Sequence, residues 1–179
     1  MDIAHLLSDK TTKAIQKREH IVYAIERHQI SITALRACAT DDKSTGVILE
    51  AMESVSKHAP SVADIEWLHY AIEHISSKSN TVKREASRVV GNIAHLFPDH
   101  IANAVEKLMA NTGNPGTVVR WATAYALGQI VRMPRYANSE LFDAVDTLAK
   151  CETETGVKNQ YLSGLKKGVK IRKSADCCV

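Results

Sequence analysis

Residues 117–131 read T-V-V-R-W-A-T-A-Y-A-L-G-Q-I-V, and this stretch has the pattern of an amphipathic helix. Its apolar residues recur at three- and four-residue intervals, which places them on one helical face: Val119, Ala122, Ala126, Leu127 and Ile130. Thr117 is predicted to cap the helix, because its hydroxyl can accept a bond from an N–H group of the first turn. Gly128 lies inside the helix, where glycine lowers helix stability by about 1 kcal/mol relative to alanine. We therefore expect a packing reason for this glycine, namely a neighbouring helix that approaches closely.

The same pattern recurs at a nearly constant distance along the chain. Asn80 precedes Thr117, Thr155 follows it, and Asp42 precedes Asn80, each time by an almost identical interval. Each of these polar residues is predicted to cap a helix, as Thr117 is. The period of roughly 37 to 38 residues is typical of stacked helical repeats. The shorter period and the Trp-Leu-Gly-Tyr pattern of tetratricopeptide repeats are not found.

Further helices are predicted between these repeated ones. They cover residues 62–77 after a cap at Ser61, a segment with Ile101, Val105 and Leu108, and a segment that begins at Ser139. Two earlier helices, from Thr11 or Thr12 to His28 and from Ser31 to Ala39, are expected to cap the stack at its N-terminal end. The sequence therefore predicts an all-α protein, an α-solenoid of stacked antiparallel helix pairs with about three to four repeats. Residues 1–170 are expected to form one domain, and residues 171–179 a C-terminal tail.

The repeated motif also resembles that of a known family. V-R-W-A-T-A-Y-A-L-G at 119–128 resembles the inner-helix signature of HEAT repeats, and V-K-R-E-A-S-R-V-V-G at 82–91 is similar. V-K-N-Q-Y-L-S-G-L at 157–165 matches more loosely, with Tyr161 where the family favours alanine. The resemblance covers roughly residues 42–168 and implies a curved stack whose inner helices line a concave surface. Such motifs are specific for architecture and carry little information on function.

Composition and charge exclude several classes of protein. The chain has 179 residues, of which 45% are hydrophobic and 24% charged, as in ordinary globular domains. Its net charge of +3 is smaller than the clustered basic excess of most nucleic-acid-binding domains. Apolar runs are too short to cross a bilayer and Met1–Leu7 does not resemble a signal peptide, so no membrane span or export is expected. The four cysteines form no C-x-x-C pair, and free thiols favour a cytoplasmic location.

The sequence shows no pattern of catalytic or metal-binding residues. Neither a phosphate-binding loop nor a nucleophile elbow nor an H-E-x-x-H motif occurs. Glu66 and His69 form a single E-x-x-H, whereas a di-iron bundle needs two such motifs and further glutamates. No metal, cofactor or enzymatic activity is therefore expected.

Five residues are candidates for partner binding. In the repeat register they occupy the second and sixth positions after the motif valine, which point away from the apolar stripe: Arg84, Arg88, Trp121, Tyr125 and Asn159. Arginine, tryptophan and tyrosine are enriched at binding hot spots, so these residues indicate a contact patch on the concave face. An alternative is that Trp121 and Tyr125 pack on the adjoining helix. In the same alternative, Lys83, Arg120 and Lys158 form the internal basic ladder that HEAT repeats often have.

Two functions follow from the resemblance. The first is a non-enzymatic interaction or scaffold module that holds a protein or peptide on its concave surface. The second is a DNA-binding or DNA-repair protein similar to the HEAT-like alkylpurine glycosylases, which cradle the duplex on a basic face with tryptophans and a catalytic aspartate. Trp67 and Trp121 could serve this role, but no aspartate matches the catalytic one. The basic segment 166–173 could bind an anionic partner, or it could simply complement the negative end of a helix.

Overall fold

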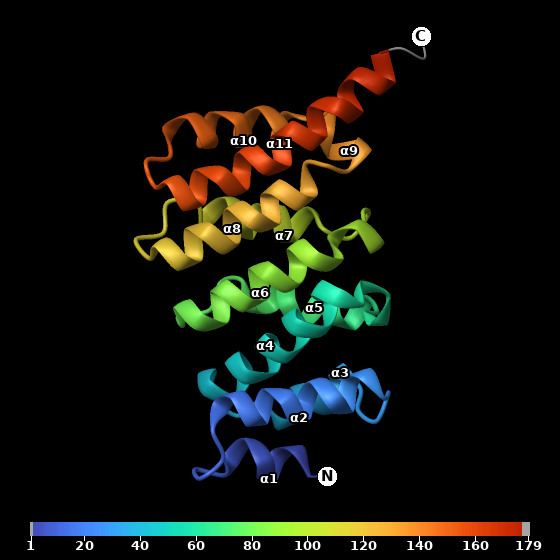
Figure 1. Ribbon diagram of the computed structural model, residues 1–179, viewed down its shortest axis with the longest axis vertical. Helices are drawn as coiled ribbons and strands as arrows, with labels where there is room; N and C mark the ends of the chain where they lie inside the picture. Colours follow the sequence, from blue (N-terminus) through green and yellow to red (C-terminus); the bar gives the residue numbers. More distant parts are fainter. Residues whose placement is uncertain (1, 177–179) are drawn as a thin grey trace.

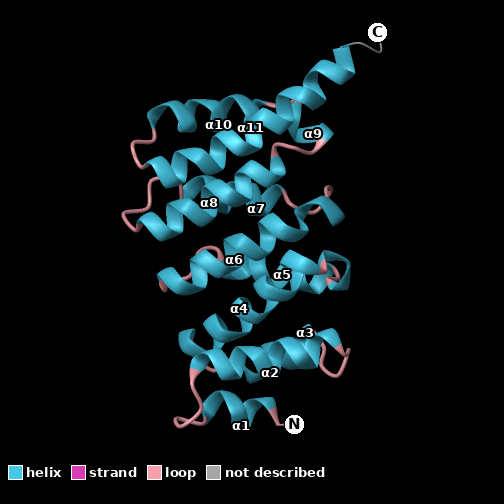
Figure 2. Ribbon diagram, viewed as in Figure 1, coloured by secondary structure: helices cyan, strands magenta, loops and turns pink. Residues whose placement is uncertain are grey.

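The regular structure of the chain is entirely helical in the computed structural model, which describes residues 2–176 and side chains up to Arg172. The α-helices are α1 (Ile3–Ser8), α2 (Ala14–Glu26), α3 (Ile32–Cys38), α4 (Asp42–His58), α5 (Ile65–His74), α6 (Asn80–Ile93), α7 (Ala102–Ala110), α8 (Thr117–Ile130), α9 (Pro134–Ala137), α10 (Glu140–Cys151) and α11 (Thr155–Asp176). Short 3-10 helices, η1 (Pro60–Val62) and η2 (Ala94–Leu96), follow α4 and α6. The predicted all-α class is thereby confirmed for the described residues (Figure 2).

The helices follow one another along the long axis of the molecule, from the N-terminus at one end to the C-terminus at the other (Figure 1). A first row consists of α2, α4, α6, α8 and α11, and each of these helices contacts the next. A second row contains α1, α3, α5 and α7, again in successive contact. The rows are joined where α5 packs on α6 and α7 on α8, and α10 packs on α11 at the C-terminal end of the molecule.

The predicted period is present in the positions where the helices of the first row begin. Asp42, Asn80, Thr117 and Thr155 are the first helical residues of α4, α6, α8 and α11. The prediction that they cap these helices was wrong by one residue. Asp41 and Ser79 are the N-caps, and they accept bonds from Ser44 N at 2.7 Å and Val82 N at 3.5 Å. Gly116 precedes α8 without a side-chain cap, because it has no side chain to offer.

Other predicted boundaries also need correction. The helix expected at 62–77 is the shorter α5, because Asp64 rather than Ser61 caps it by accepting a bond from Trp67 N at 3.1 Å. Helix α8 ends at Ile130, and Pro134 begins the short helix α9, since proline fits the first position of a helix.

The expected C-terminal tail at 171–179 is helical in its first part. Helix α11 continues to Asp176, and residues 177–179 lie outside the described part of the chain. The Arg172 guanidinium lies 3.9 Å from the centroid of the Phe142 ring, and its Nη1 lies 3.1 Å from Asp143 Oδ1. These contacts with α10 hold this part of α11 against the preceding helix.

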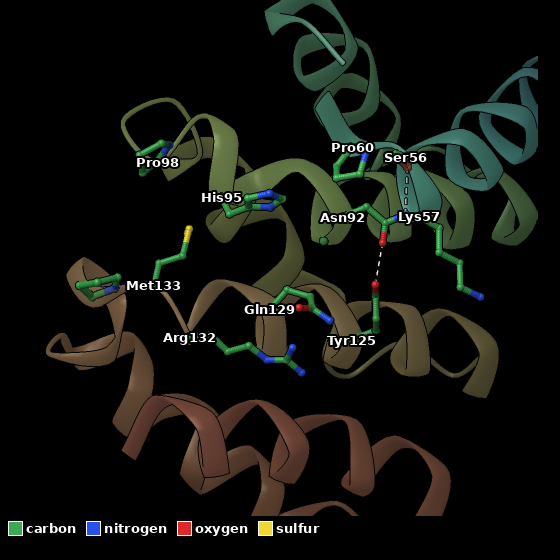
Figure 3. A pocket seen from close by; sticks show the side chains of 12 residues that line it. Ser56, Lys57, Pro60, Asn92, His95, Pro98, Tyr125, Gln129, Arg132 and Met133 are labelled. Carbon is green, nitrogen blue, oxygen red and sulfur yellow. Dashed lines mark hydrogen bonds between the residues drawn. The ribbon is translucent and has the colours of Figure 1, made fainter. Parts of the chain in front are cut away.

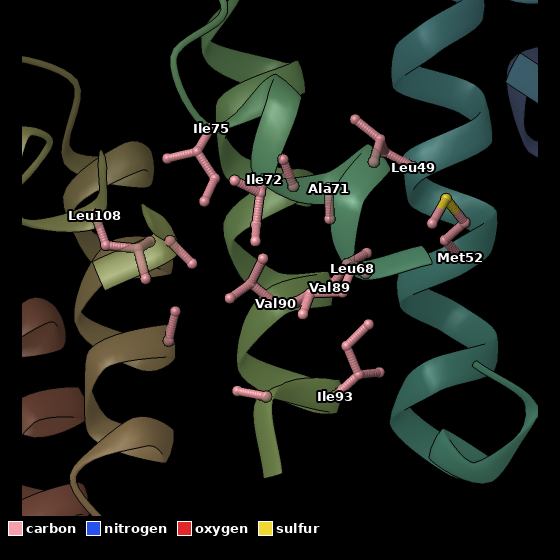
Figure 4. Packing of buried hydrophobic residues seen from close by; sticks show 14 of the residues in the cluster. Leu49, Met52, Leu68, Ala71, Ile72, Ile75, Val89, Val90, Ile93 and Leu108 are labelled. Carbon is pink, nitrogen blue, oxygen red and sulfur yellow. The ribbon is translucent and has the colours of Figure 1, made fainter. Parts of the chain in front are cut away.

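A continuous aliphatic core fills the space between the two rows. Figure 4 shows its central part, where Leu49, Leu68, Val90 and Leu108 from α4, α5, α6 and α7 are fully buried. The motif valines Val82, Val119 and Val157 are also fully buried, as their common place in the repeat register predicts. Helix α8 contacts both α6 and α11, and its Leu127 is fully buried.

Glycines let α6, α8 and α11 approach one another closely. A Cβ atom on Gly91 would lie 2.9 Å from the Tyr125 ring, and one on Gly128 would lie 2.8 Å from the Gln160 carbonyl oxygen. A Cβ atom on Gly164 would overlap the backbone of Gly128. The expected packing reason for Gly128 is therefore confirmed, and this close approach sets the geometry of the surface described next.

Candidate binding surface on α6 and α8

A shallow cavity lies between α6 and the beginning of α8. It has a volume of about 310 Å³ and is lined by Arg84, Arg88, Thr117, Val118 and Trp121. The structure thus brings together three of the five predicted contact residues. Val118 is 51% exposed, and Trp121 is half-buried. We refer to this cavity as the tryptophan hollow.

Trp121 and Tyr125 stack on each other along α8. Their ring centroids are 5.9 Å apart and their planes differ by 2°. The Tyr125 hydroxyl donates to Asn92 Oδ1 at 2.6 Å, and the Asn92 amide donates to Ser56 Oγ at 2.9 Å. Burial raises the pKa of Tyr125, so its hydroxyl remains a donor. Tyr125 therefore packs on the adjoining helix, as the alternative interpretation predicted, whereas Trp121 keeps an open face.

The two arginines of the tryptophan hollow are already paired with carboxylates. Arg84 Nε lies 2.5 Å from Glu85 Oε1, and its Nη2 lies 3.5 Å from Glu50 Oε1. Arg88 Nη2 lies 2.6 Å from Glu53 Oε1, and its Nη1 lies 2.9 Å from Glu85 Oε2. Both predicted contact arginines therefore form ion pairs within the protein.

The acidic members of this cluster lie in a poorly solvated environment. Glu85 is 1% exposed and sits between both arginines. Burial raises the pKa of Glu50, and the neighbouring Glu85 carboxylate raises it further. Burial also raises the pKa of Glu53, although Arg88 opposes this shift. The cluster holds the arginine side chains in place.

The remaining predicted residues lie apart from the hollow. Asn159 is exposed on α11 and does not line the hollow. Arg120 Nε lies 3.2 Å from Glu152 Oε2, and its Nη1 donates to the Asn114 carbonyl at 2.9 Å. Arg120 therefore ties α8 to the loops on either side of it, as expected of an internal basic residue rather than a contact residue.

A second cavity, of about 490 Å³, lies between α6 and α8 at their C-terminal ends. Figure 3 shows Asn92 and His95 on one side of it and Tyr125, Gln129 and Arg132 on the other. Lys57, at the end of α4, also lines it. Sequence reasoning missed this cavity. Its basic residues recur at the same interval as the helix starts, so extending the repeat register could have found them.

The E-x-x-H pair and the second tryptophan both lie on α5. Glu66 Oε1 and His69 Nδ1 lie 3.8 Å apart on the surface of α5, and Trp67 is buried at 4% exposure. In the described part of the chain, three or more histidine, cysteine or acidic side chains nowhere gather closely enough to hold a metal ion. Between residues 2 and 176, every helix is too short or too polar to cross a membrane.

Comparison with known proteins gives a structural relative but no family. No family model and no curated protein matches the chain. Its structure is similar to the crystal structure of an engineered protein, with a TM-score of 0.64 and 18% sequence identity. The match covers 98% of this chain and 85% of the engineered one. At this identity the likeness concerns the fold alone, and it agrees with the all-helical class.

Proposed function

We propose that the chain is a HEAT-like α-solenoid of three to four repeats that acts as a non-enzymatic interaction module. The periodic starts of α4, α6, α8 and α11 and the successive contacts within each row support this architecture. The proposed ligand is a segment of another protein or a peptide. The observation that carries the proposal is the tryptophan hollow, in which half-buried Trp121 and exposed Val118 offer apolar surface to solvent.

The hollow has the properties of a side-chain pocket for a peptide. Tryptophan supplies a large contact area, and few of its rotatable bonds need to be fixed when a partner binds. Tyr125 stacks on one side of Trp121. Gly156 of α11 lies next to Trp121, since a Cβ atom added to this glycine would lie 3.8 Å from Trp121 Cδ1. The Arg84 and Arg88 side chains are held by their carboxylates before any partner arrives. A preorganised rim of this kind lowers the entropic cost of association.

The DNA-binding alternative has less support. A duplex needs cations that can replace the counterions of its phosphates. Arg84 and Arg88 are each paired with glutamates, so neither is free to replace the counterions of a phosphate backbone. Trp67, the second tryptophan considered for this role, is buried at 4% exposure in α5. The balance of charge therefore favours a protein ligand.

Replacing the hollow's aromatic residue tests the proposed function. We expect Trp121→Ala to weaken the binding of a captured partner by at least about thirtyfold, the effect of losing a hot-spot residue. Tyr23→Ala is the matched control, because Tyr23 is 49% exposed on α2 and lies outside the hollow. Quantitative affinity capture from cells, followed by titration of the purified partner, gives the measurement. Equal retention of every partner by both variants would contradict the proposal.

A salt titration tests the alternative directly. We expect the wild-type protein to bind a fluorescent 20-base-pair duplex weakly, without the steep decrease of affinity with salt that several phosphate contacts produce. Fluorescence anisotropy between about 50 and 200 mM salt measures this dependence. Submicromolar affinity with a steep salt slope, lost in Trp121→Ala, would instead support the DNA-binding function.

A further inference from the structure

The second cavity carries three basic side chains from three successive helices of the first row. Lys57 belongs to the last turn of α4, His95 to η2 after α6, and Arg132 to the segment after α8. The three residues are separated by the same interval as the helix starts, so they occupy one position of the repeat. Among the described residues that line this cavity, none is acidic. This arrangement contrasts with the glutamate-rich cluster beside the tryptophan hollow.

Cations are favoured at the C-terminal ends of helices by the helix dipole, which could account for each residue separately. The dipole does not account for the environment of the Arg132 guanidinium. Its Nε is buried without a hydrogen-bond partner, and its Nη2 lies 3.5 Å from Ser163 Oγ, at the limit of a hydrogen bond. Burial lowers the pKa of Arg132, as expected for a cation that lacks a compensating charge. A buried donor without a partner is costly, and an entering anion would satisfy it.

We infer that this cavity accepts the carboxylate of an aspartate or glutamate in the bound peptide, whose apolar side chain occupies the tryptophan hollow. The inference rests on the proposed function and specifies the ligand for it. Carboxylates form strong, often bidentate bonds with arginine. Pro60, Pro98 and Met133 add apolar surface to the cavity, which suits the aliphatic part of an acidic side chain.

The geometry of α8 sets the distance between the two contacts. Trp121, Tyr125 and Gln129 follow one another at intervals of four residues and therefore lie on one face of α8, and Arg132 lies just beyond the end of this helix. Trp121 and Arg132 are separated by about 16 Å along the axis, at 1.5 Å per residue. An extended peptide covers this distance in about five residues, at roughly 3.3 Å per residue. The expected ligand thus has an apolar side chain and an acidic one about five positions apart.

The pairing of charges distinguishes the two ends of the ligand. Lys57 and Arg132 line a cavity without acidic residues and would attract an acidic group, whereas the arginines of the tryptophan hollow are already paired with glutamates. These paired arginines also offer a phosphate backbone no free cation at the hollow. An acidic peptide is therefore favoured over a nucleic acid.

Selection from a library of random twelve-residue peptides displayed on phage tests the inference. We expect clones selected on the wild-type protein to share an acidic residue about five positions from an apolar one. Selection on Arg132→Gln should lose the acidic preference and keep the apolar one, and Arg132→Lys should restore part of the acidic preference. Arg36→Gln removes an arginine from α3, where it pairs with Glu73, and serves as the control that leaves both preferences intact.

The selected wild-type peptide is then synthesised with a fluorescent label and with its acidic residue either present or changed to the amide. We expect the Arg132→Gln protein to bind the acidic peptide about tenfold to hundredfold more weakly, and both proteins to bind the amide peptide alike. Circular dichroism of the variants confirms that each is folded. Peptides that depend on Trp121 but not on an acidic residue would overturn this inference and leave the proposed function standing. A library without any clone that depends on Trp121 or Arg132 would reject both.

Discussion

Leu127→Ala is expected to lower the free energy of unfolding by about 2–5 kcal/mol, the range for deleting a buried leucine side chain. Leu127 is fully buried in the middle of α8, which contacts α6 on one side and α11 on the other. The substitution removes apolar contacts and leaves a cavity that helices fixed on both sides cannot easily close. Denaturation in urea, followed by circular dichroism at 222 nm, measures the change.

Leu162→Ala provides a control with identical chemistry. Leu162 is 44% exposed on α11, so its truncation should cost less than about 1 kcal/mol. Because each helix of the first row contacts chiefly its neighbours, the Leu127 variant could also unfold in two steps, with α8 and α11 first. A decreased m-value would reveal such a loss of cooperativity. Similar losses of stability in both variants would contradict the position of α8 between α6 and α11.

Much of the fold could be predicted because the repeat of roughly 37 to 38 residues gives the positions of both the helix starts and the buried valines. Val82, Val119 and Val157 share a register position, and all three are fully buried. The exact N-cap residue could not be predicted for α4 and α6, because two residues that can cap a helix are adjacent where each of these helices begins. Asp41 precedes Asp42 and Ser79 precedes Asn80, and local preference alone does not distinguish the members of such a pair.

The candidate surface could be predicted only in part. Trp121 is identifiable from its residue type and register, which are local properties. The pairing of Arg88 with Glu53 depends on how far α6 is shifted along α4, and the period does not determine this shift. The second cavity was missed because its equivalent positions hold three different residue types, lysine, histidine and arginine. Only an extension of the repeat register beyond the motif helices relates these three positions to one another.

Gly164→Ala is expected to destabilise the protein by about 1–3 kcal/mol or more, because overpacking at a backbone contact cannot be relieved by rotating a side chain. An added Cβ atom would overlap Gly128 Cα and its carbonyl oxygen, so α11 would have to move away from α8. Gly156→Ala, in the same helix, should have the opposite effect. Its Cβ atom would meet Trp121 at an ordinary distance of 3.8 Å, and alanine favours the helix by up to about 1 kcal/mol.

Thermal and urea denaturation of the two variants should therefore give changes of opposite sign for the same substitution in one helix. The comparison also bears on the binding surface, because Trp121 faces the first turn of α11. If Gly164→Ala displaces α11, the fluorescence of Trp121 should change in the folded state, whereas buried Trp67 in α5 should be unaffected. Trp67→Phe in both backgrounds isolates the Trp121 signal. Two variants of equal stability would show that α8 and α11 do not meet at these glycines. In that case α11 would not form a fixed border of the tryptophan hollow.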